Sequence, residues 1–159
     1  MKILMVCLGN ICRSPLAEGI LQDMAAKAGL NWIVESAGTN GYHTGEPPHH
    51  LSIKVAKQNG LDISRQQSRL FAAADLAQFD LIYAMATDVL EEMKRIAGKK
   101  FDPKKVDLLL NELYAGEHRD VPDPWYGPEQ GYHETYAIIH KACKSIVKKH
   151  TNPEEKKYA

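Results

Sequence analysis

Short apolar runs alternate along the chain with segments in which apolar residues recur every three or four positions. Residues 2–7 (KILMVC) form an almost uninterrupted apolar run, which is typical of a central parallel strand buried on both faces. Further strands are predicted at residues 32–37, 80–85 and 106–110. Because helical patterns separate these strands, we expect an α/β fold with a parallel sheet.

The helical patterns have recognisable starts and stops. The first helix is predicted to begin with Ser14 as its N-cap and Pro15 in its first turn, and to end before Gly29. Further helices are predicted at residues 51–58, 68–78 and 87–97. A long C-terminal helix is predicted to bury one face, made of Tyr132, Tyr136, Ile139, Cys143 and Ile146.

The length of 159 residues suits one domain with one core, which we expect to span residues 1–150. Residues 151–159 are polar and are expected to fray at the end of the last helix. Turn-forming residues concentrate at 38–48 and 114–131, which are predicted to be irregular.

Composition and charge narrow the possible partners and compartments. Twenty basic residues balance twenty acidic ones, which gives no support to a nucleic-acid or membrane-surface partner. No apolar stretch approaches the roughly 20 residues needed to span a bilayer, and residues 3–7 are too short for a signal-peptide core. Three cysteines, an odd and sparse set, do not form a disulfide framework. We therefore expect free thiols and a cytoplasmic location.

The segment between the first strand and the first helix carries the candidate chemistry. Cys7 ends the strand, Gly9 allows a tight turn, and Arg13 and Ser14 stand at the helix start. Backbone N–H groups in such a loop form a nest for a tetrahedral anion, and the helix N-terminus adds its positive dipole end. This environment favours the thiolate form of Cys7, while the Arg13 fork can bind two phosphoryl oxygens.

The string VCLGNICRSP at residues 6–15 resembles the signature of the low-molecular-weight protein tyrosine phosphatases. The resemblance implies a three-layer fold in which a four-stranded parallel sheet of order 2-1-3-4 has helices on both faces and a phosphate-binding loop after the first strand. It implies hydrolysis of phosphotyrosine through a phosphocysteine on Cys7, with Arg13 binding the phosphate, inorganic phosphate as product and no metal or other cofactor. The substrate-binding loop residues it implies are Leu8, Gly9, Asn10, Ile11, Cys12 and Ser14.

More distant segments extend this resemblance. In the string VPDPWYG at residues 121–127, prolines on both sides stiffen the backbone around Asp123, which the family uses as general acid and then general base. Trp125 and Tyr126 resemble the aromatic wall of the substrate pocket, and Tyr42 its rim. Ser36 resembles the family serine that supports a left-handed Asn10. Arg65 and Ala86 depart from the animal members, which carry His and Asp there as a structural pair.

Several alternatives remain open. An arsenate reductase of the same fold needs extra cysteines near the third strand, where this chain has Tyr83 and Met85. A phosphoarginine phosphatase favours Thr where this chain has Ile11. A non-catalytic phosphotyrosine reader would not need to retain the nucleophile and the acid. The physiological substrate is expected to be a phosphotyrosine protein, and the oligomeric state a monomer or weak homodimer.

Single residues also have simpler interpretations. Cys7 and Asp123 taken alone would suit a buried cysteine and a turn residue. Cys12 is equally compatible with core packing and with a reversible disulfide to Cys7, and Cys143 is assigned to the core. The pair His49-His50 does not suit a zinc site, because neighbouring residues point apart and no further ligands have the right spacing.

Overall fold

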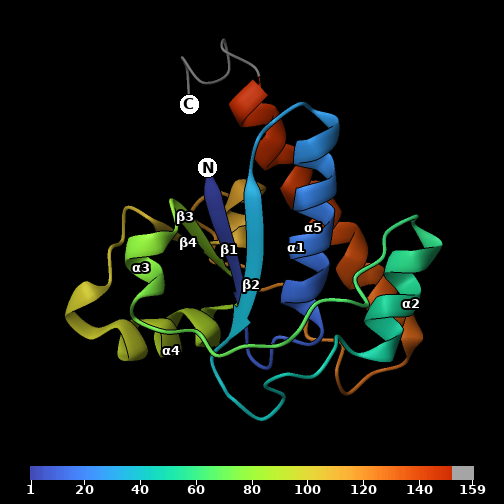
Figure 1. The fold of residues 1–159 in the computed structure, drawn as a ribbon, viewed down its shortest axis with the longest axis horizontal. Coiled ribbons are helices and arrows are strands. Elements are labelled where there is room, and N and C mark those ends of the chain that lie inside the picture. Colours follow the sequence, from blue (N-terminus) through green and yellow to red (C-terminus); the bar gives the residue numbers. More distant parts are fainter. Residues whose placement is uncertain (152–159) are drawn as a thin grey trace.

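The computed structural model describes residues 1–151 and is organised around one central sheet (Figure 1). The four strands are all parallel and lie in the order β2-β1-β3-β4, as predicted. They are β1 (Lys2–Cys7), β2 (Ile33–Gly38), β3 (Leu81–Ala84) and β4 (Val106–Leu108). Because β1 is central, its C-terminal end at Cys7 lies between the ends of β2 and β3.

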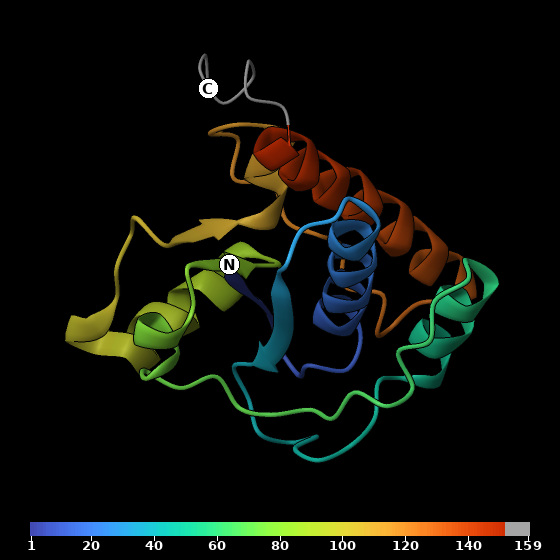
Figure 2. The ribbon, with the colours of Figure 1, turned by 45° about the horizontal axis from the view of Figure 1, so that its top comes forward.

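Helices cover both faces of the sheet, which gives three layers (Figure 2). The α-helices are α1 (Arg13–Lys27), α2 (His50–Gln58), α3 (Asp75–Gln78), α4 (Thr87–Ala97) and α5 (Glu129–Thr151), and the short 3-10 turns are Gly98–Lys100 and Leu109–Glu112. The helices α1, α2 and α5 lie on one face, and α3 and α4 lie on the other. None of the helices within residues 1–151 is long and apolar enough to cross a membrane.

The side chains of β1 alternate between two hydrophobic cores. Ile3 and Met5 belong to the core beneath α1 and α5, whereas Leu4 and Val6 belong to the core beneath α4. All four are fully buried, as expected for a strand covered on both faces. Cys7 is next in this alternation, and it stays on the α1 side where the strand ends.

The predicted apolar face of α5 is confirmed. Its five predicted positions are all buried, and they include Tyr132 at 1% exposure and Cys143 at 0%. Helix α5 runs alongside α1, which begins at the end of the candidate loop. Thr151, the first residue of the expected tail at 151–159, is the last residue of α5. The rest of that tail lies outside the described residues.

The predicted helix over residues 68–78 is wrong in its first half, since only Asp75–Gln78 is helical. Residues 68–71 instead run beside the end of β2, where Gly38 N–H donates to Arg69 O at 2.9 Å and Phe71 N–H donates to Gly38 O at 2.7 Å. The backbone therefore satisfies its hydrogen bonds with a distant strand, which local periodicity does not reveal.

The predicted start of the first helix also needs correction. Helix α1 begins at Arg13, and the side chain of Ser14 does not cap it. The Ser14 hydroxyl instead lies 2.9 Å from Cys7 Sγ and accepts a hydrogen bond from Asn10 Nδ2 at 2.8 Å. The hydroxyl of a serine at a helix start can either cap the helix or bind groups of the preceding loop. The Ser14 hydroxyl binds groups of the loop. The fourth strand is likewise shorter than predicted, because residues 109–112 form a 3-10 turn.

Candidate active site

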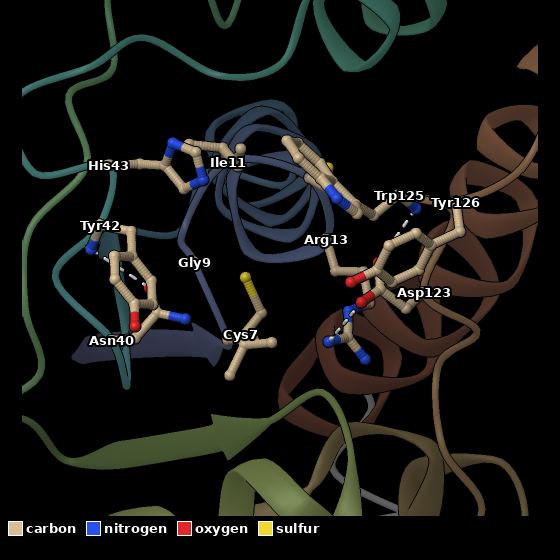
Figure 3. A pocket seen from close by; sticks show the side chains of 12 residues that line it. Cys7, Gly9, Ile11, Arg13, Asn40, Tyr42, His43, Asp123, Trp125 and Tyr126 are labelled. Carbon is tan, nitrogen blue, oxygen red and sulfur yellow. Dashed lines mark hydrogen bonds and ion pairs between the residues drawn. The ribbon is translucent and has the colours of Figure 1, made fainter.

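A cavity of about 260 Å³ opens at the C-terminal end of β1 (Figure 3). Figure 3 shows the Cys7 sulfur pointing into it, with Arg13 and Asp123 on one side and Tyr42 on the opposite side. The lining residues are Cys7, Leu8, Gly9, Ile11, Cys12, Arg13, Asn40, Tyr42, His43, Asp123, Trp125 and Tyr126. The structure therefore brings together the predicted nucleophile, phosphate-binding arginine and acid.

The Cys7 sulfur stands at the junction between strand and helix. Cys7 is 2% exposed, and its Sγ lies 2.9 Å from Ser14 Oγ. A thiolate cannot donate a hydrogen bond, so in the ionised state the Ser14 hydroxyl must be the donor. The adjacent N-terminus of α1 presents backbone N–H groups, and its dipole favours negative charge at this position.

Asn10 holds the loop in its curved shape. Its φ of 58° lies in the left-handed region, as predicted, and this region is costly for a residue with a side chain. The Asn10 side chain compensates by donating from Nδ2 to Ser14 Oγ and to Ser36 Oγ, the latter at 2.9 Å. Its Oδ1 accepts from Arg69 N–H at 3.0 Å. Ser36 thus makes the contact to Asn10 that the resemblance implies.

Gly38 permits this loop to pack closely against β2. A Cβ at Gly38 would lie 2.9 Å from both Asn10 N and Leu8 O, which are backbone atoms and cannot move aside cheaply. The loop also hydrogen-bonds to the segment after β2, because Asn40 N–H donates to Leu8 O at 2.9 Å. The sheet therefore fixes the position of the loop from one side.

Arg13 connects the loop to the segment that carries the predicted acid. Its side chain is almost fully buried, and its Nη1 donates to Val121 O at 3.0 Å. Its Nη2 lies 3.6 Å from Asp123 Oδ2. Val121 N–H in turn donates to Met85 O at 2.8 Å, just after β3. A guanidinium held in this way is preorganised for an anion in the loop, since little side-chain freedom is left to lose.

The mouth of the cavity is lined with exposed aromatic rings. Tyr42 is 88% exposed and Tyr126 is 93% exposed, while the Trp125 ring lies with its centroid 5.7 Å from that of His43. His43 Nδ1 is also 2.7 Å from Glu46 Oε2. These rings can contact a flat substrate group only outside the narrow end of the cavity.

Sequence reasoning missed two residues of this cavity, Asn40 and His43. Both lie in the irregular segment after β2, which has no periodicity to mark them. Only the strand order could have placed these two residues near the site, because the end of β2 adjoins the end of β1 in a sheet of this order. Conversely, Asn10, Ser14 and Ser36 lie behind the cavity wall and act on it through hydrogen bonds.

The second cysteine of the loop has a different environment from the first. Cys12 is 5% exposed, and its Sγ lies 3.7 Å from the Tyr132 hydroxyl. Burial raises the pKa of Cys12 to about 12, with the hydrogen bond to Tyr132 opposing this and Cys7 adding to it. Cys12 therefore remains a thiol at neutral pH. Burial also raises the pKa of Cys143, which lies away from the cavity in α5.

The pair His49-His50 lies at the start of α2, where His49 has contacts that stabilise the fold. His49 Nδ1 accepts a hydrogen bond from Leu51 N–H at the start of α2, and its ring stacks on Tyr132 with centroids 5.1 Å apart. Burial lowers the pKa of His49, and the neighbouring His50 adds to this effect. Across residues 1–151, no group of three or more His, Cys, Asp or Glu side chains is arranged to hold a metal ion.

Alkylation of the native protein with iodoacetamide at pH 7 is expected to modify Cys7 alone. All three cysteines are buried, but burial raises the pKa values of Cys12 and Cys143, so neither supplies thiolate at this pH, whereas the Cys7 sulfur points into the cavity. Peptide mass spectrometry after partial reaction measures the selectivity, and inorganic phosphate is expected to slow the reaction. A Cys12→Ala variant is the control, which should react at the wild-type rate. Equal modification of Cys12 and Cys7 would contradict this assignment.

Comparison with known proteins identifies the family. A model of the low molecular weight phosphotyrosine protein phosphatases matches residues 2–156. The low molecular weight protein-tyrosine-phosphatase YfkJ of Bacillus subtilis is 35% identical over 148 residues, which is 92% of this chain and 93% of the relative.

Solved structures share the fold over almost their whole length. A protein tyrosine phosphatase from Entamoeba histolytica with Hepes in its active site superposes with a TM-score of 0.87 at 34% identity, covering 99% of both chains. A Drosophila arginine phosphatase also gives 0.87, at 31% identity, covering 96% of this chain and 99% of that one. With its Cys7 loop at the end of the central strand, this chain belongs to the low molecular weight phosphotyrosine protein phosphatase family.

Proposed function

We propose that this protein hydrolyses phosphotyrosine in protein substrates through a phosphocysteine intermediate on Cys7. The observation that carries the proposal is the convergence of the Cys7 sulfur, the Arg13 guanidinium and the Asp123 carboxylate on one cavity. Nucleophile, anion-binding group and proton donor are the three functions that a phosphate-ester hydrolase of this kind requires.

Substrate binding begins with the phosphate dianion in the loop. Leu8, Gly9, Ile11, Cys12 and Arg13 line the space in front of Cys7, where backbone N–H groups of the loop and the N-terminus of α1 can bind the phosphoryl oxygens. Arg13 is already anchored by Val121 O, so its remaining N–H groups can bind two phosphoryl oxygens together. These positive groups offset the repulsion between a thiolate and a dianion, and they stabilise the charge that spreads over the phosphoryl oxygens in the transition state.

In the first step, Cys7 Sγ attacks phosphorus. The S–P bond forms as the bond from phosphorus to the tyrosyl oxygen breaks, and protonated Asp123 gives its proton to that oxygen. The Asp123 Oδ1 accepts from Trp125 N–H at 3.1 Å, which holds the carboxyl at the mouth of the cavity. The free tyrosine side chain then leaves past the aromatic rings.

In the second step, water attacks the phosphocysteine. The carboxylate of Asp123 takes a proton from the water, the S–P bond breaks, and inorganic phosphate and the Cys7 thiolate are released. The Ser14 hydroxyl, 2.9 Å from the sulfur, donates to the thiolate as it leaves. The cycle needs only groups of this chain and water. Because it depends on a reduced sulfur, and the cysteines of residues 1–151 are free thiols, it suits the cytoplasm.

The wall of the cavity favours an aromatic ester over a phosphoarginine. Ile11 is 7% exposed and adds an apolar surface beside the loop, and Trp125 adds a second one. A phosphorylated guanidinium would place polar N–H groups against these two apolar side chains. The similarity to the Drosophila arginine phosphatase keeps phosphoarginine as the second candidate substrate.

The substitution Cys7→Ser is expected to reduce kcat on an aryl phosphate by at least about 10⁴-fold, because a serine hydroxyl is a far weaker nucleophile here. Binding of inorganic phosphate, measured by calorimetry, should persist because Arg13 and the loop amides are unchanged. Turnover near the wild-type rate would remove Cys7 from the mechanism.

The substitution Asp123→Ala is expected to lower kcat by about 10²–10⁴-fold for a phenyl phosphate with a poor leaving group. For an aryl phosphate whose phenolate leaves easily, the loss in the first step should be much smaller. A series of substituted phenyl phosphates measures this dependence. A uniform loss of kcat/KM across the series, which reports on the first step alone, would show that Asp123 does not protonate the leaving group. Glu117→Ala is the control, since Glu117 pairs with Arg119 at the surface.

Peptides of one sequence carrying phosphotyrosine, phosphoserine or phosphoarginine test the substrate class directly. The expected kcat/KM is at least about tenfold higher for phosphotyrosine than for phosphoarginine, because the apolar side chains of Ile11 and Trp125 suit an aromatic ring better than polar guanidinium N–H groups. The variant Ile11→Thr, which adds a hydroxyl at the wall, should narrow that ratio. A wild-type preference for phosphoarginine would replace the first candidate with the second.

A further inference from the structure

Glu18 lies on α1 behind the cavity, and the mechanism above does not use it. Its Oε1 accepts a hydrogen bond from Ser36 Oγ at 2.8 Å. We propose that Glu18 is a positioning residue, which supports the hydrogen-bond chain that ends at the Cys7 sulfur. The inference rests on the proposed function, because it concerns the nucleophile of that same site.

The chain crosses three segments of the fold without a gap. From Glu18 on α1 it passes to Ser36 on β2, to Asn10 in the loop, and to Ser14 at the start of α1. The successive donor–acceptor distances are 2.8 Å, 2.9 Å and 2.8 Å, and the last contact, from Ser14 Oγ to Cys7 Sγ, is 2.9 Å. The three distances between nitrogen and oxygen atoms lie within the ordinary range for hydrogen bonds.

The direction of each bond follows from its neighbours. The Arg69 backbone N–H can only donate, so Asn10 must face it with Oδ1 and face both serines with its amino group. Ser36 and Ser14 therefore both accept from Asn10. Each hydroxyl has a single hydrogen left, which Ser36 gives to Glu18.

The remaining hydrogen of Ser14 then points to the sulfur. Its other acceptor, Ala37 O, is more distant at 3.5 Å. With Glu18 ionised, every hydrogen in the chain is directed outward from Asn10, toward a carboxylate at one end and a thiolate at the other. Hydrogen bonds in such a chain strengthen one another, so the carboxylate makes Ser36 a better acceptor for the strained Asn10.

The surroundings of Glu18 indicate that its position is costly for a charge. It is half-buried, and burial raises its pKa, with Glu35 on β2 adding to this. The Ser36 hydrogen bonds and the charge of Arg69 oppose the rise. A glutamate that only kept α1 soluble would be placed on the outer face of the helix. Here the carboxylate instead faces the strand that supports the loop.

A simple charge effect predicts the opposite outcome from the hydrogen-bond chain. A negative charge near a thiol disfavours the thiolate, so removing the charge of Glu18 would by itself make Cys7 more reactive. Replacing the carboxylate with the neutral amide of Gln, in contrast, weakens the hydrogen bond that Ser36 donates, because an amide oxygen is a weaker acceptor, and so it weakens the support of Asn10 and Ser14. Cys7 then becomes less reactive. The sign of the change separates the two explanations.

The test is alkylation of Cys7 by iodoacetamide between pH 5 and pH 8 in the variant Glu18→Gln, with kcat/KM measured in parallel. The expected result is a fall in the alkylation rate at pH 6 of about threefold to tenfold, the worth of one hydrogen bond. The limiting rate at high pH should stay the same, because the sulfur itself is unchanged. A loss of accessibility alone would lower the rate equally at every pH.

Three further variants sharpen the test. Glu18→Asp keeps the charge but shortens the side chain, which moves the carboxylate away from Ser36. It should therefore lower the alkylation rate as Glu18→Gln does. A rate equal to that of the wild type would mean that only the charge matters. In a Ser36→Ala background, Glu18→Gln should have no further effect on the rate. Glu35→Gln removes a neighbouring charge from β2 and should change the rate by less than about twofold, as expected for a surface charge.

Faster or unchanged alkylation of Glu18→Gln at pH 6 would overturn the proposal, as would an equal fall in the Ser36→Ala background. If Glu18→Gln does not fold, the comparison of Glu18→Asp with wild type decides between the same two outcomes. Alkylation requires no turnover, so it reports on Glu18 even if the protein proves inactive on phosphotyrosine, which would overturn only the proposed function.

Discussion

The site depends on the left-handed backbone of Asn10 and the hydrogen bonds that hold it there. A side chain at φ 58° is strained, and the strain persists because Ser14, Ser36 and the Arg69 backbone all bind the Asn10 amide. These partners come from α1, β2 and the segment before α3. The conformation of the loop therefore depends on α1, on β2 and on the segment before α3, and not on the loop sequence alone.

Arg13 joins this loop to the segment that carries Asp123, and so it sets the spacing between the proposed nucleophile and the proposed acid. It is buried among groups that satisfy part of its guanidinium, with Val121 O as its fixed acceptor and Asp123 at 3.6 Å. Because Val121 is itself bonded to Met85 after β3, the position of the acid follows from the order of the strands. A phosphoryl group can then meet sulfur, arginine and carboxyl without a large rearrangement.

Sequence patterns predicted the parallel sheet and most helices, because strand burial and helical periodicity are local properties, whereas the strand order came from the family resemblance. Together with that resemblance, the distinctive neighbours of the Cys7 loop and of the Pro-flanked Asp123 also led to ten of the cavity residues. The failures share a different cause. The non-helical segment at 68–71 and the contact of the Ser14 hydroxyl with Cys7 both depend on hydrogen bonds to other segments. Periodicity contains no information about such partners.

The covalent step is the central claim, and trapping the intermediate tests it most directly. Wild-type protein is mixed with a phosphotyrosine peptide, quenched with denaturant during steady-state turnover, and digested for mass spectrometry. We expect a single phosphoryl group on the peptide that contains Cys7, and we expect this group to disappear once the substrate is exhausted. A phosphoryl group on another residue, or turnover with no phosphorylated peptide under conditions where hydrolysis of the intermediate limits the rate, would contradict it.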